Sequence, residues 1–279
     1  MRRSLIALLS FAVAAAAAAQ TPAPVAAVAV PGAGPIADEA AFAKAPPASV
    51  KLFPQVLTTP HGPATPSIGQ VTVRAVRNRD HAGFLLEWDD ATEDARTAVT
   101  AFGDMAAVAF PAQAPGKPLP APFMGNAGGR VQILQWRADW QTDLVRGPIT
   151  VAELYPNTYA SDYRPEDHLP KAAGDRYRGG VAAGNPMSAV HTSSVQDLMA
   201  EGFGSLTPRA KQQAQGHARH DGSGWHVVIT RPLAADGDSA PSLAAGTTTQ
   251  LALAVWDGAK GEVGARKAWA GWIPLEIAR

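Results

Sequence analysis

The sequence predicts a mainly β fold, an antiparallel β-sandwich with a few short helices and long loops. Short segments alternate apolar and polar residues with the two-residue period of a strand. Turn-forming residues separate these segments, and the chain contains 26 glycines and 24 prolines. Helical periodicity is rare by comparison. Many short strands between turns, with little helix, are typical of a sandwich.

Composition limits the classes of function. The chain has 279 residues, of which 24 are basic and 24 acidic, and it has no cysteine. The balanced charge argues against a nucleic-acid partner, and a hydrophobic content of 46% argues against disorder. The lack of cysteine excludes disulfides, cysteine-ligated zinc or iron–sulfur clusters, and covalent c-type haem. Any cofactor must be held by His, Met, Lys, Tyr or carboxylate side chains, or by shape.

The N-terminus predicts export from the cytoplasm. Arg2 and Arg3 precede the apolar run Leu5–Ala18, which is too short to span a bilayer, and small residues continue to Ala19. We therefore expect residues 1–19 to be a signal peptide and the mature protein to lie in the periplasm. No later segment is apolar enough to predict a transmembrane segment.

The rest of the chain is expected to have two parts. Residues 20–49 are rich in alanine, proline and valine and have almost no aromatic residues, which predicts a flexible tether. Residues 50–279 are expected to form the sandwich domain. Its predicted strands include Val71–Ala75, Phe84–Trp88, Ala106–Phe110, Val131–Trp136 and Trp225–Arg231.

Between the predicted strands lie one long loop and one short helix. Residues 139–186 lack periodicity and are expected to form a loop of the kind that carries function or wraps a partner. A helix is expected to begin at Thr192 or Ser193 as its cap and to end at Gly202. Its apolar face would consist of Val195, Leu198 and Met199.

The C-terminal segment Leu251–Ile277 predicts a β-hairpin around which the other strands assemble. Counting by twos places Lys267 on the same face as Trp269, Gly271, Ile273 and Leu275. A charged ammonium group on an apolar face is unfavourable. The lysine therefore either lies at the solvated end of the strand or has lost its proton to a group that requires the free amine.

The residues alone predict no catalytic centre. The chain lacks the motifs G-x-S-x-G and H-E-x-x-H and has no P-loop. His217, His220 and His226 form a weak metal-like cluster, for which surface histidines are the simpler interpretation. Asp89 and Asp90 lie in a turn, where carboxylates usually accept hydrogen bonds from the backbone.

Six motifs in a fixed order carry a resemblance to a known family. They are DMAAVAFP from residue 104, FMG from 123, VQILQWRAD from 131, EGFGSLT from 201, GWHVVI from 224 with RPL from 231, and AVWDG from 254. Together they resemble the haem b (gamma) subunit of type II enzymes of the DMSO reductase family. Ethylbenzene dehydrogenase, dimethylsulfide dehydrogenase, chlorate reductase and selenate reductase belong to that group. The resemblance extends from about Val50 to Ile277.

The resemblance implies a sandwich that holds one non-covalent haem b, with a methionine and a lysine as axial ligands of the iron. In this sequence the methionine matches Met124, next to Gly125, and the lysine matches Lys267, shortly before Trp272. The lysine must bind as the neutral amine, and burial favours that form. With both axial positions filled, such a haem relays electrons and the subunit has no catalytic residue.

The resemblance also implies partners. They are a molybdopterin catalytic subunit and an iron–sulfur subunit, with electrons passing between the clusters, the haem and a soluble periplasmic cytochrome. Arg130 and Arg137 are the candidates for binding the haem propionates, although arginines near strand ends are usually just solvated.

Several alternatives remain open at this point. Met105, Met187 and Met199 are rival ligands to Met124, and His81, His191 and His226 are rivals to Lys267. Without the resemblance, Met124 is more simply a loop residue packing on Trp136, and Lys267 a strand-end lysine reaching solvent. The alternative functions are a periplasmic module that binds carbohydrate or another small ligand through exposed tryptophans, and a structural subunit without haem.

Overall fold

The computed structural model describes residues 23–56, 64–112, 116–147, 191–234 and 241–279, together with residues 153, 155–157 and 183. The expected signal peptide lies outside these residues. The β-strands within them are β1 (Val25–Ala29), β2 (Ala48–Lys51), β3 (Phe53–Pro54), β4 (Gln70–Arg77), β5 (His81–Asp89), β6 (Met105–Pro111), β7 (Val131–Arg137), β8 (Val195–Ala200), β9 (Thr207–Pro208), β10 (Gln215–His220), β11 (Gly224–Pro232), β12 (Thr248–Trp256) and β13 (Ala268–Ile277). The helices are η1 (Glu39–Phe42), α1 (Ala138–Arg146) and η3 (Gly258–Lys260). The prediction of a mainly β protein is confirmed, including the hairpin of β12 and β13.

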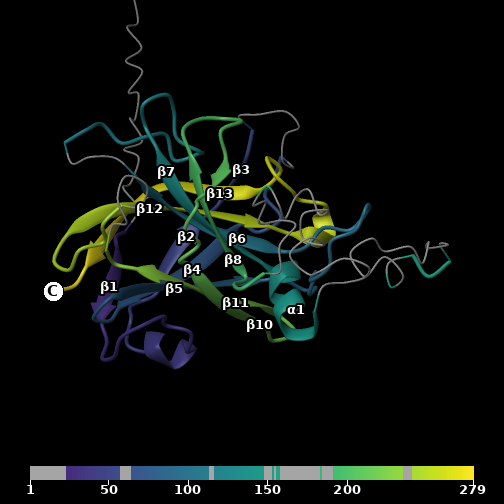
Figure 1. Ribbon diagram of the computed structural model, residues 1–279, viewed down its shortest axis with the longest axis horizontal. Helices are drawn as coiled ribbons and strands as arrows, with labels where there is room; N and C mark the ends of the chain where they lie inside the picture. The colour runs from purple at the N-terminus through teal and green to yellow at the C-terminus, as the bar shows by residue number, and fades with distance from the viewer. Residues whose placement is uncertain are drawn as a thin grey trace, which may run out of the picture.

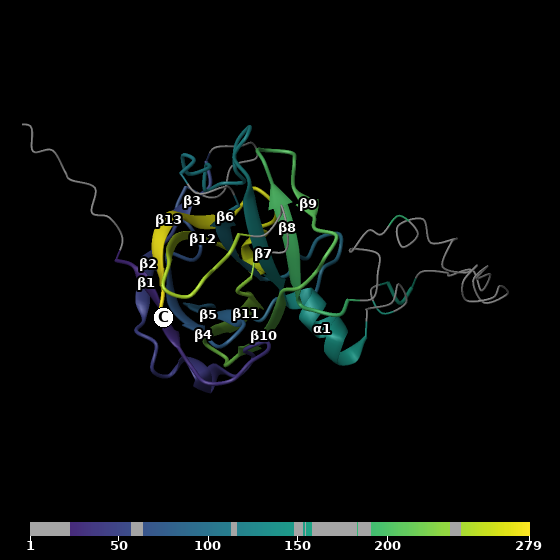
Figure 2. The ribbon, with the colours of Figure 1, turned by 60° about the vertical axis from the view of Figure 1, so that its left-hand side comes forward.

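The strands form one curled sheet in the order β10-β11-β5-β4-β1-β13-β12-β6-β7-β8-β9, with β2 paired to β4 and β3 to β13. We call β10, β11, β5 and β4 the first arm, and β13, β12, β6, β7 and β8 the second arm. The arms lie as facing layers (Figures 1 and 2). β1 joins them through parallel pairing with β4 and β13, so the layers of the expected sandwich are continuous at one edge.

The main core fills the space between the two arms. Trp136 of β7 meets Trp225 of β11 with ring centroids 4.9 Å apart, and Phe84 of β5 meets Phe110 of β6 at 5.4 Å. These strands are far apart in the order of the sheet, so the contacts exist only because the sheet curls. Aromatic pairs with inclined rings add to the hydrophobic free energy that holds the arms together.

The outer faces of the two arms differ. A second apolar cluster, which includes Ile36, Phe42 and Ala45 near η1, covers the first arm by packing on Val76, Leu85 and Val228. The second arm has only a small outer cluster, formed by Met105, Ala107 and Trp256 with Ile133 and Ala254 packed against it. The outer face of the second arm is therefore where the fold leaves room for another group.

The expectation of a flexible tether over residues 20–49 is wrong for its described part. Val25 and Ala27 are buried in the main core, η1 begins at an Asp38 cap, and β2 pairs with β4. Small residues predicted flexibility because alanine and proline are typical of linkers. In this fold small side chains instead allow β1 to fit between β4 and β13, a parallel pairing that leaves no local signal in the sequence.

The helix expected after Thr192 or Ser193 is also wrong, because residues 195–200 form strand β8, which pairs with β7. An apolar spacing of three and four residues suggested a helix, but the intervening Gln196 and Asp197 are buried as well. Asp197 accepts hydrogen bonds from Gln132 and Arg209, so its burial is compensated. Because polar side chains are buried in β8 as well, its sequence does not show the alternation of apolar and polar residues that predicts a strand.

Helix α1 begins one residue before the segment that was expected to be a loop and occupies its first eight residues. Its buried residues are Ala138 and Trp140, too few to give a helical period. Gln141 fixes the helix to β10, since its side chain accepts a hydrogen bond from the Ala218 N–H and donates one to the Ala218 carbonyl. Across the described ranges, no helix combines the length and the hydropathy that a membrane crossing requires.

The place of β1 between the arms gives a testable prediction. A chain that begins at Glu39 lacks β1 and exposes the edges of both β4 and β13. We expect its free energy of unfolding to fall by at least ~3 kcal/mol relative to a chain that begins at Ala23, from lost apolar burial alone. The melting temperature should fall by about 10 °C. Equal urea midpoints for the two chains would show that β1 adds no stability.

Candidate functional site

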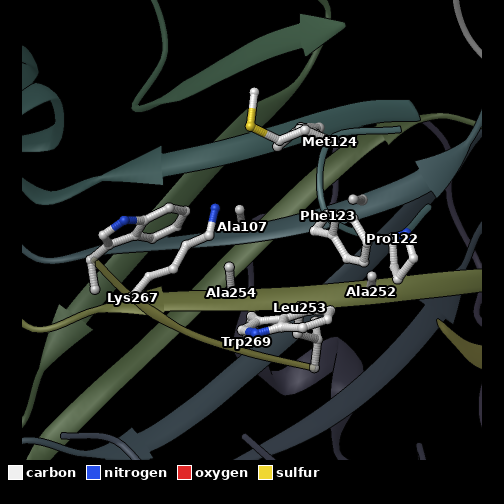
Figure 3. A pocket seen from close by; sticks show the side chains of 12 residues that line it. Ala107, Pro122, Phe123, Met124, Ala252, Leu253, Ala254, Lys267 and Trp269 are labelled. Carbon is white, nitrogen blue, oxygen red and sulfur yellow. The ribbon is translucent and has the colours of Figure 1, made fainter. Parts of the chain in front are cut away.

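The outer face of the second arm contains a cavity of about 460 Å³. This volume lies within the range of about 300–1,000 Å³ that is typical of small-molecule and cofactor sites. Its walls come from β6, β7 and β8 through Met105, Ile133 and Leu198, and from loops through Met124, Phe203 and Lys267. A smaller adjoining hollow of about 40 Å³ shares Met124 and Lys267 with it (Figure 3).

Alanines form the floor of the smaller hollow. Ala107 and Ala109 of β6 stand opposite Ala254 and Ala252 of β12, and all four line the hollow. The alternate residues of both strands, such as Val108 and Leu253, enter the main core. Methyl side chains leave a flat apolar surface, whereas larger side chains at these positions would fill the space above the sheet.

The loop that carries Met124 is fixed over this floor. The indole N–H of Trp272 in β13 donates a hydrogen bond to the Pro120 carbonyl at 2.7 Å. On the other side, the Gly202 N–H donates to the Met124 carbonyl at 2.7 Å. Phe123 packs edge-on against Trp269 of β13. The loop is thus bound to β13 and to the turn after β8, which brings the Met124 side chain over the second arm.

Met124 has an unusual backbone conformation. Its φ of 78° makes it the one non-glycine residue with positive φ in the part of the chain that the structure describes. For an ordinary residue this conformation costs roughly 1–2 kcal/mol. Gly125 also has positive φ, and a Cβ there would collide with the Gly129 carbonyl, so this position requires glycine. Strain of this kind clusters at functional sites.

Lys267 lies directly before β13. Its side chain enters the cavity from the side opposite the loop that carries Met124. Its amine lies 4.8 Å from the centre of the Trp256 ring. Figure 3 shows the amine and the Met124 sulfur projecting toward the same space. The chain therefore brings a thioether and an amine from two distant segments to one apolar cavity.

The prediction of which residues share a face with Lys267 is partly wrong. Ala268 and Ala270 enter the main core, but so do Ile273 and Leu275. The pairing of β12 and β13 shifts between Leu251 and Leu253, because β13 contains an extra residue there, a β-bulge. Lys267 and Trp269 consequently share the outer face, while Ile273 and Leu275 face inward. A bulge reverses the face of every later residue in the strand, so counting by twos predicts the wrong face beyond it.

The surroundings of Lys267 favour its neutral form. Burial among apolar side chains lowers the pKa of Lys267 to about 8, because leaving water disfavours the ammonium. The side chain keeps some accessible surface since it lines the cavity. It forms no ion pair with any carboxylate in the described part of the chain. Relative to a free lysine, the neutral fraction at pH 7 rises by roughly 300-fold.

The two arginines named from the sequence lie in different places. Arg137 lines the cavity, where it forms an ion pair with Asp139 at 2.9 Å and lies over the Trp140 ring. Arg130 does not line it. Its side chain is half exposed and pairs with Glu201 at 2.9 Å. The structure thus brings Met124, Lys267 and Arg137 together and leaves Arg130 on the surface.

Most of the rival ligands lie elsewhere. Met187 lies outside the described residues, and Met199 on β8 does not line the cavity. His81 pairs with Asp80, His191 with Asp143, and His226 with Asp221, all away from the cavity. Met105 does line it, but its sulfur accepts a hydrogen bond from Gln135. Met124 does not pack on Trp136, which lies in the main core.

Several residues that line the cavity were not predicted from the sequence. Gln135 and Gln55 add polar groups to the wall, and Trp256 adds an aromatic face. The alanine floor was the one signal that could have been found, since every outward residue between Met105 and Pro111 is alanine. None of the seven tryptophans is exposed: five are buried and two, Trp269 and Trp272, are half-buried. The exposed tryptophans on which a carbohydrate-binding surface would depend are therefore missing.

Comparison with known proteins gives one family and distant relatives. A family model described as ethylbenzene dehydrogenase matches residues 39–268. The gamma subunit of chlorate reductase from Ideonella dechloratans is 27% identical over 195 residues, which cover 70% of this chain and 59% of that protein. A protein of Haloferax mediterranei, whose name assigns it as the heme subunit of a respiratory nitrate reductase, is 23% identical over 207 residues. That match covers 74% of this chain and 55% of the relative, so this chain spans less than two thirds of both relatives.

Two solved structures of a family 9 carbohydrate-binding module from Caldicellulosiruptor kristjanssonii, with glucose and with cellotriose, also match. Each is 9% identical, with TM-scores of 0.37 and 0.36. The matches cover 91% and 90% of this chain, and 96% and 93% of the modules. Similarity this low supports no conclusion about this chain.

The lowered pKa of Lys267 predicts how stability depends on pH. Below pH 8 the folded state carries a buried ammonium, whereas above pH 10.5 the amine is neutral in both states. Between these values the unfolded state binds more protons, so Lys267 makes stability rise with pH. We expect Lys267→Leu to raise the free energy of unfolding of the haem-free protein at pH 7 by about 1–2 kcal/mol, discounted for partial solvent access.

Urea unfolding at pH 7 and pH 10 measures this effect. The increase in the free energy of unfolding caused by Lys267→Leu should be larger at pH 7 than at pH 10. Lys117→Leu, at an exposed loop position, is the matched control and should change neither value. A Lys267→Leu protein that is less stable than the parent at pH 7 would contradict a buried, unpaired ammonium.

Proposed function

This chain belongs to the ethylbenzene dehydrogenase family, and we propose on that basis that it is an electron-transfer subunit that binds one non-covalent haem b. Met124 and Lys267 would be the axial ligands of the iron. The observation that carries the proposal is that Met124 and Lys267 line the same cavity from opposite segments, over a floor of alanines. One relative carries the word heme in its name.

The residues of the cavity fit a haem in shape. The alanine floor offers a flat apolar surface, and Phe123, Trp256 and Trp269 supply aromatic walls. These features suit a planar macrocycle whose faces are apolar. The strain held at Met124 supports a role for this residue, because the packing of an ordinary loop residue does not require positive φ.

The donor atoms fit the iron as well. A thioether is a soft donor that raises the reduction potential of haem iron, and an amine can donate only as the free base. The cavity lowers the pKa of Lys267 to about 8 and so supplies that base near neutral pH. When bound, haem supplies one-electron chemistry. This chain's own residues would hold the group and exclude water, and the lowered pKa of Lys267 reduces the cost of removing its proton when it binds.

The family supports a proposal about partners, and the expected signal peptide supports one about location. We propose that the protein is exported to the periplasm and relays electrons between iron–sulfur clusters of a molybdopterin enzyme and a soluble cytochrome. The chlorate reductase relative is itself named as a subunit. Arg137 is the candidate for a propionate because it lines the cavity, and Asp139 would then keep its guanidinium in place. Arg130 is not retained for this role.

Haem reconstitution tests the ligand assignment. The parent protein should give a low-spin b-type spectrum with one haem per chain. Met124→Leu and Lys267→Leu should each convert it to a high-spin spectrum and weaken haem binding at least tenfold. Met199→Leu is the matched control, since this half-buried methionine does not line the cavity. Absorption and resonance Raman spectra provide the measurement.

Met105→Leu separates the two methionines that line the cavity. We expect it to keep the low-spin spectrum, because the Met105 sulfur already accepts a hydrogen bond from Gln135. A low-spin spectrum that survives Met124→Leu but not Met105→Leu would transfer the role to Met105. A parent protein that binds no haem would rule the proposal out.

The pH dependence of haem binding tests the lysine separately. Since the ligand is the free amine, binding below the pKa of Lys267, about 8, must release a proton. The association constant should therefore rise roughly tenfold per pH unit from pH 6 to pH 8 and level off above pH 8. Lys267→Leu should remove this dependence. The same slope in parent and variant would mean that another group titrates.

A further inference from the structure

Three buried carboxylates meet at one end of the two arms, away from the alanine floor. Asp90, Asp104 and Asp257 each offer an oxygen, and these oxygens lie within 4.8 Å of one another. Asp90 follows β5 in the first arm, Asp104 precedes β6, and Asp257 follows β12 in the second arm. All three are almost fully buried, with exposures of 6%, 0% and 5%.

Little positive charge compensates the three carboxylates: the Lys260 charge lowers the pKa of Asp257, but burial and the Asp90 charge raise it more. None of them forms an ion pair with a basic residue of the described ranges. Asp104 accepts hydrogen bonds from the Gly258 and Asp94 N–H groups and from the Trp225 indole, which stabilise one negative charge. Three buried carboxylates without a cation are strongly unfavourable, because each must leave water beside like charges.

The hydrogen bonding of the Asp90 carboxylate indicates that the cluster binds a further group. Asp90 Oδ1 accepts a hydrogen bond from the backbone N–H of Thr92, which matches its expected role in the turn. Asp90 Oδ2 is buried and has no hydrogen-bond partner among the residues that the structure describes. A buried oxygen without a donor loses the hydration that it would have in the unfolded chain. A bound cation would satisfy this oxygen.

The effect of Asp90 on its neighbours places its charge inside the cluster. Burial, with a smaller contribution from the Asp90 carboxylate, raises the pKa of Asp104 to about 7. Burial, followed by the Asp90 charge, also raises the pKa of Asp257. The carboxylate of Asp90 thus faces both other aspartates, and either protons or a metal ion must neutralise the group.

We propose that Asp90, Asp104 and Asp257 form a calcium-binding site. The ligands are all carboxylate oxygens, which select hard cations over zinc or copper. Calcium binds oxygen at about 2.3–2.6 Å, so two oxygens on one ion lie up to about 5 Å apart. Oxygens within 4.8 Å of one another fit this limit, and calcium accepts irregular coordination, whereas magnesium requires a nearly ideal octahedron.

Neighbouring side chains can complete the coordination. Thr92 donates its hydroxyl hydrogen to Asp94 at 2.8 Å, so residues 90, 92 and 94 bring side-chain oxygens together at alternate positions. The Asp94 charge also raises the pKa of Asp257, which places its carboxylate near the cluster. Calcium needs 6–8 oxygens, and water can provide the remainder.

The site would join the two arms beside the proposed haem cavity. Asp104 and Asp257 directly adjoin Met105 and Trp256, which are paired across β6 and β12 and line the cavity. Asp90 connects this pair to β5 in the other arm. Bound calcium would therefore stabilise the end of the sandwich that forms one cavity wall, whether or not haem is present.

Metal binding to the chelator-treated full chain tests the proposal directly. Equilibrium dialysis should give one Ca²⁺ per chain, and calcium should raise the melting temperature by several degrees. Tb³⁺ should give luminescence sensitised by Trp225, whose indole donates to Asp104, and Ca²⁺ should quench it. Asp90→Asn should weaken calcium binding at least tenfold. Glu93→Gln, an exposed acid in the same loop, should stay within twofold of the parent.

The haem-free protein is used throughout, so failure here is distinct from failure of haem binding. In chelator, Asp90→Asn should melt at or above the parent temperature, because it removes a like charge from the cluster. Asp257→Asn gives a second variant in which to repeat the comparison. A parent protein that binds no Ca²⁺, or an Asp90→Asn protein that binds it as tightly as the parent, would overturn the proposal.

Discussion

The proposed function depends most on one unfavourable arrangement, a lysine amine enclosed by apolar side chains with no carboxylate partner in the described part of the chain. Lys267 lies against Trp256, and burial lowers its pKa to about 8. A protein gains no stability from such a residue, since leucine would fill the space at lower cost. The arrangement becomes favourable when a metal centre uses the lone pair of the amine, so the stability cost of Lys267 is itself an argument for a ligand role.

Three features of the fold bring Lys267 and Met124 to the same cavity. The curl of the sheet sends large side chains into the space between the arms and leaves alanines on the outer face of β6 and β12. The bulge in β13 keeps Lys267 and Trp269 outside while later residues turn inward. The hydrogen bond from Trp272 to Pro120 then holds the Met124 loop over the floor. The alanines, the bulge and the Trp272 hydrogen bond all lie on the second arm, whereas the outer face of the first arm is closed by the cluster near η1.

The sequence predicted what depends on local pattern and missed what depends on distant pairing. Alternation identified β4, β5, β6, β7, β11 and the final hairpin. It could not identify β1, whose partners are far along the chain, or β8, whose buried Gln196 and Asp197 hide the period. Met124 and Lys267 came from the order of motifs and lie together in the structure, but Arg130 does not join them. The cluster of Asp90, Asp104 and Asp257 gave no pattern because its members meet only when the arms close.

A crystal structure of the haem-loaded full chain is the most direct test of the central claim. We expect the iron to be bound by Met124 Sδ on one side and Lys267 Nζ on the other, with the porphyrin against Ala107, Ala109, Ala252 and Ala254. Iron ligated by other residues, or haem bound outside this cavity, would contradict it.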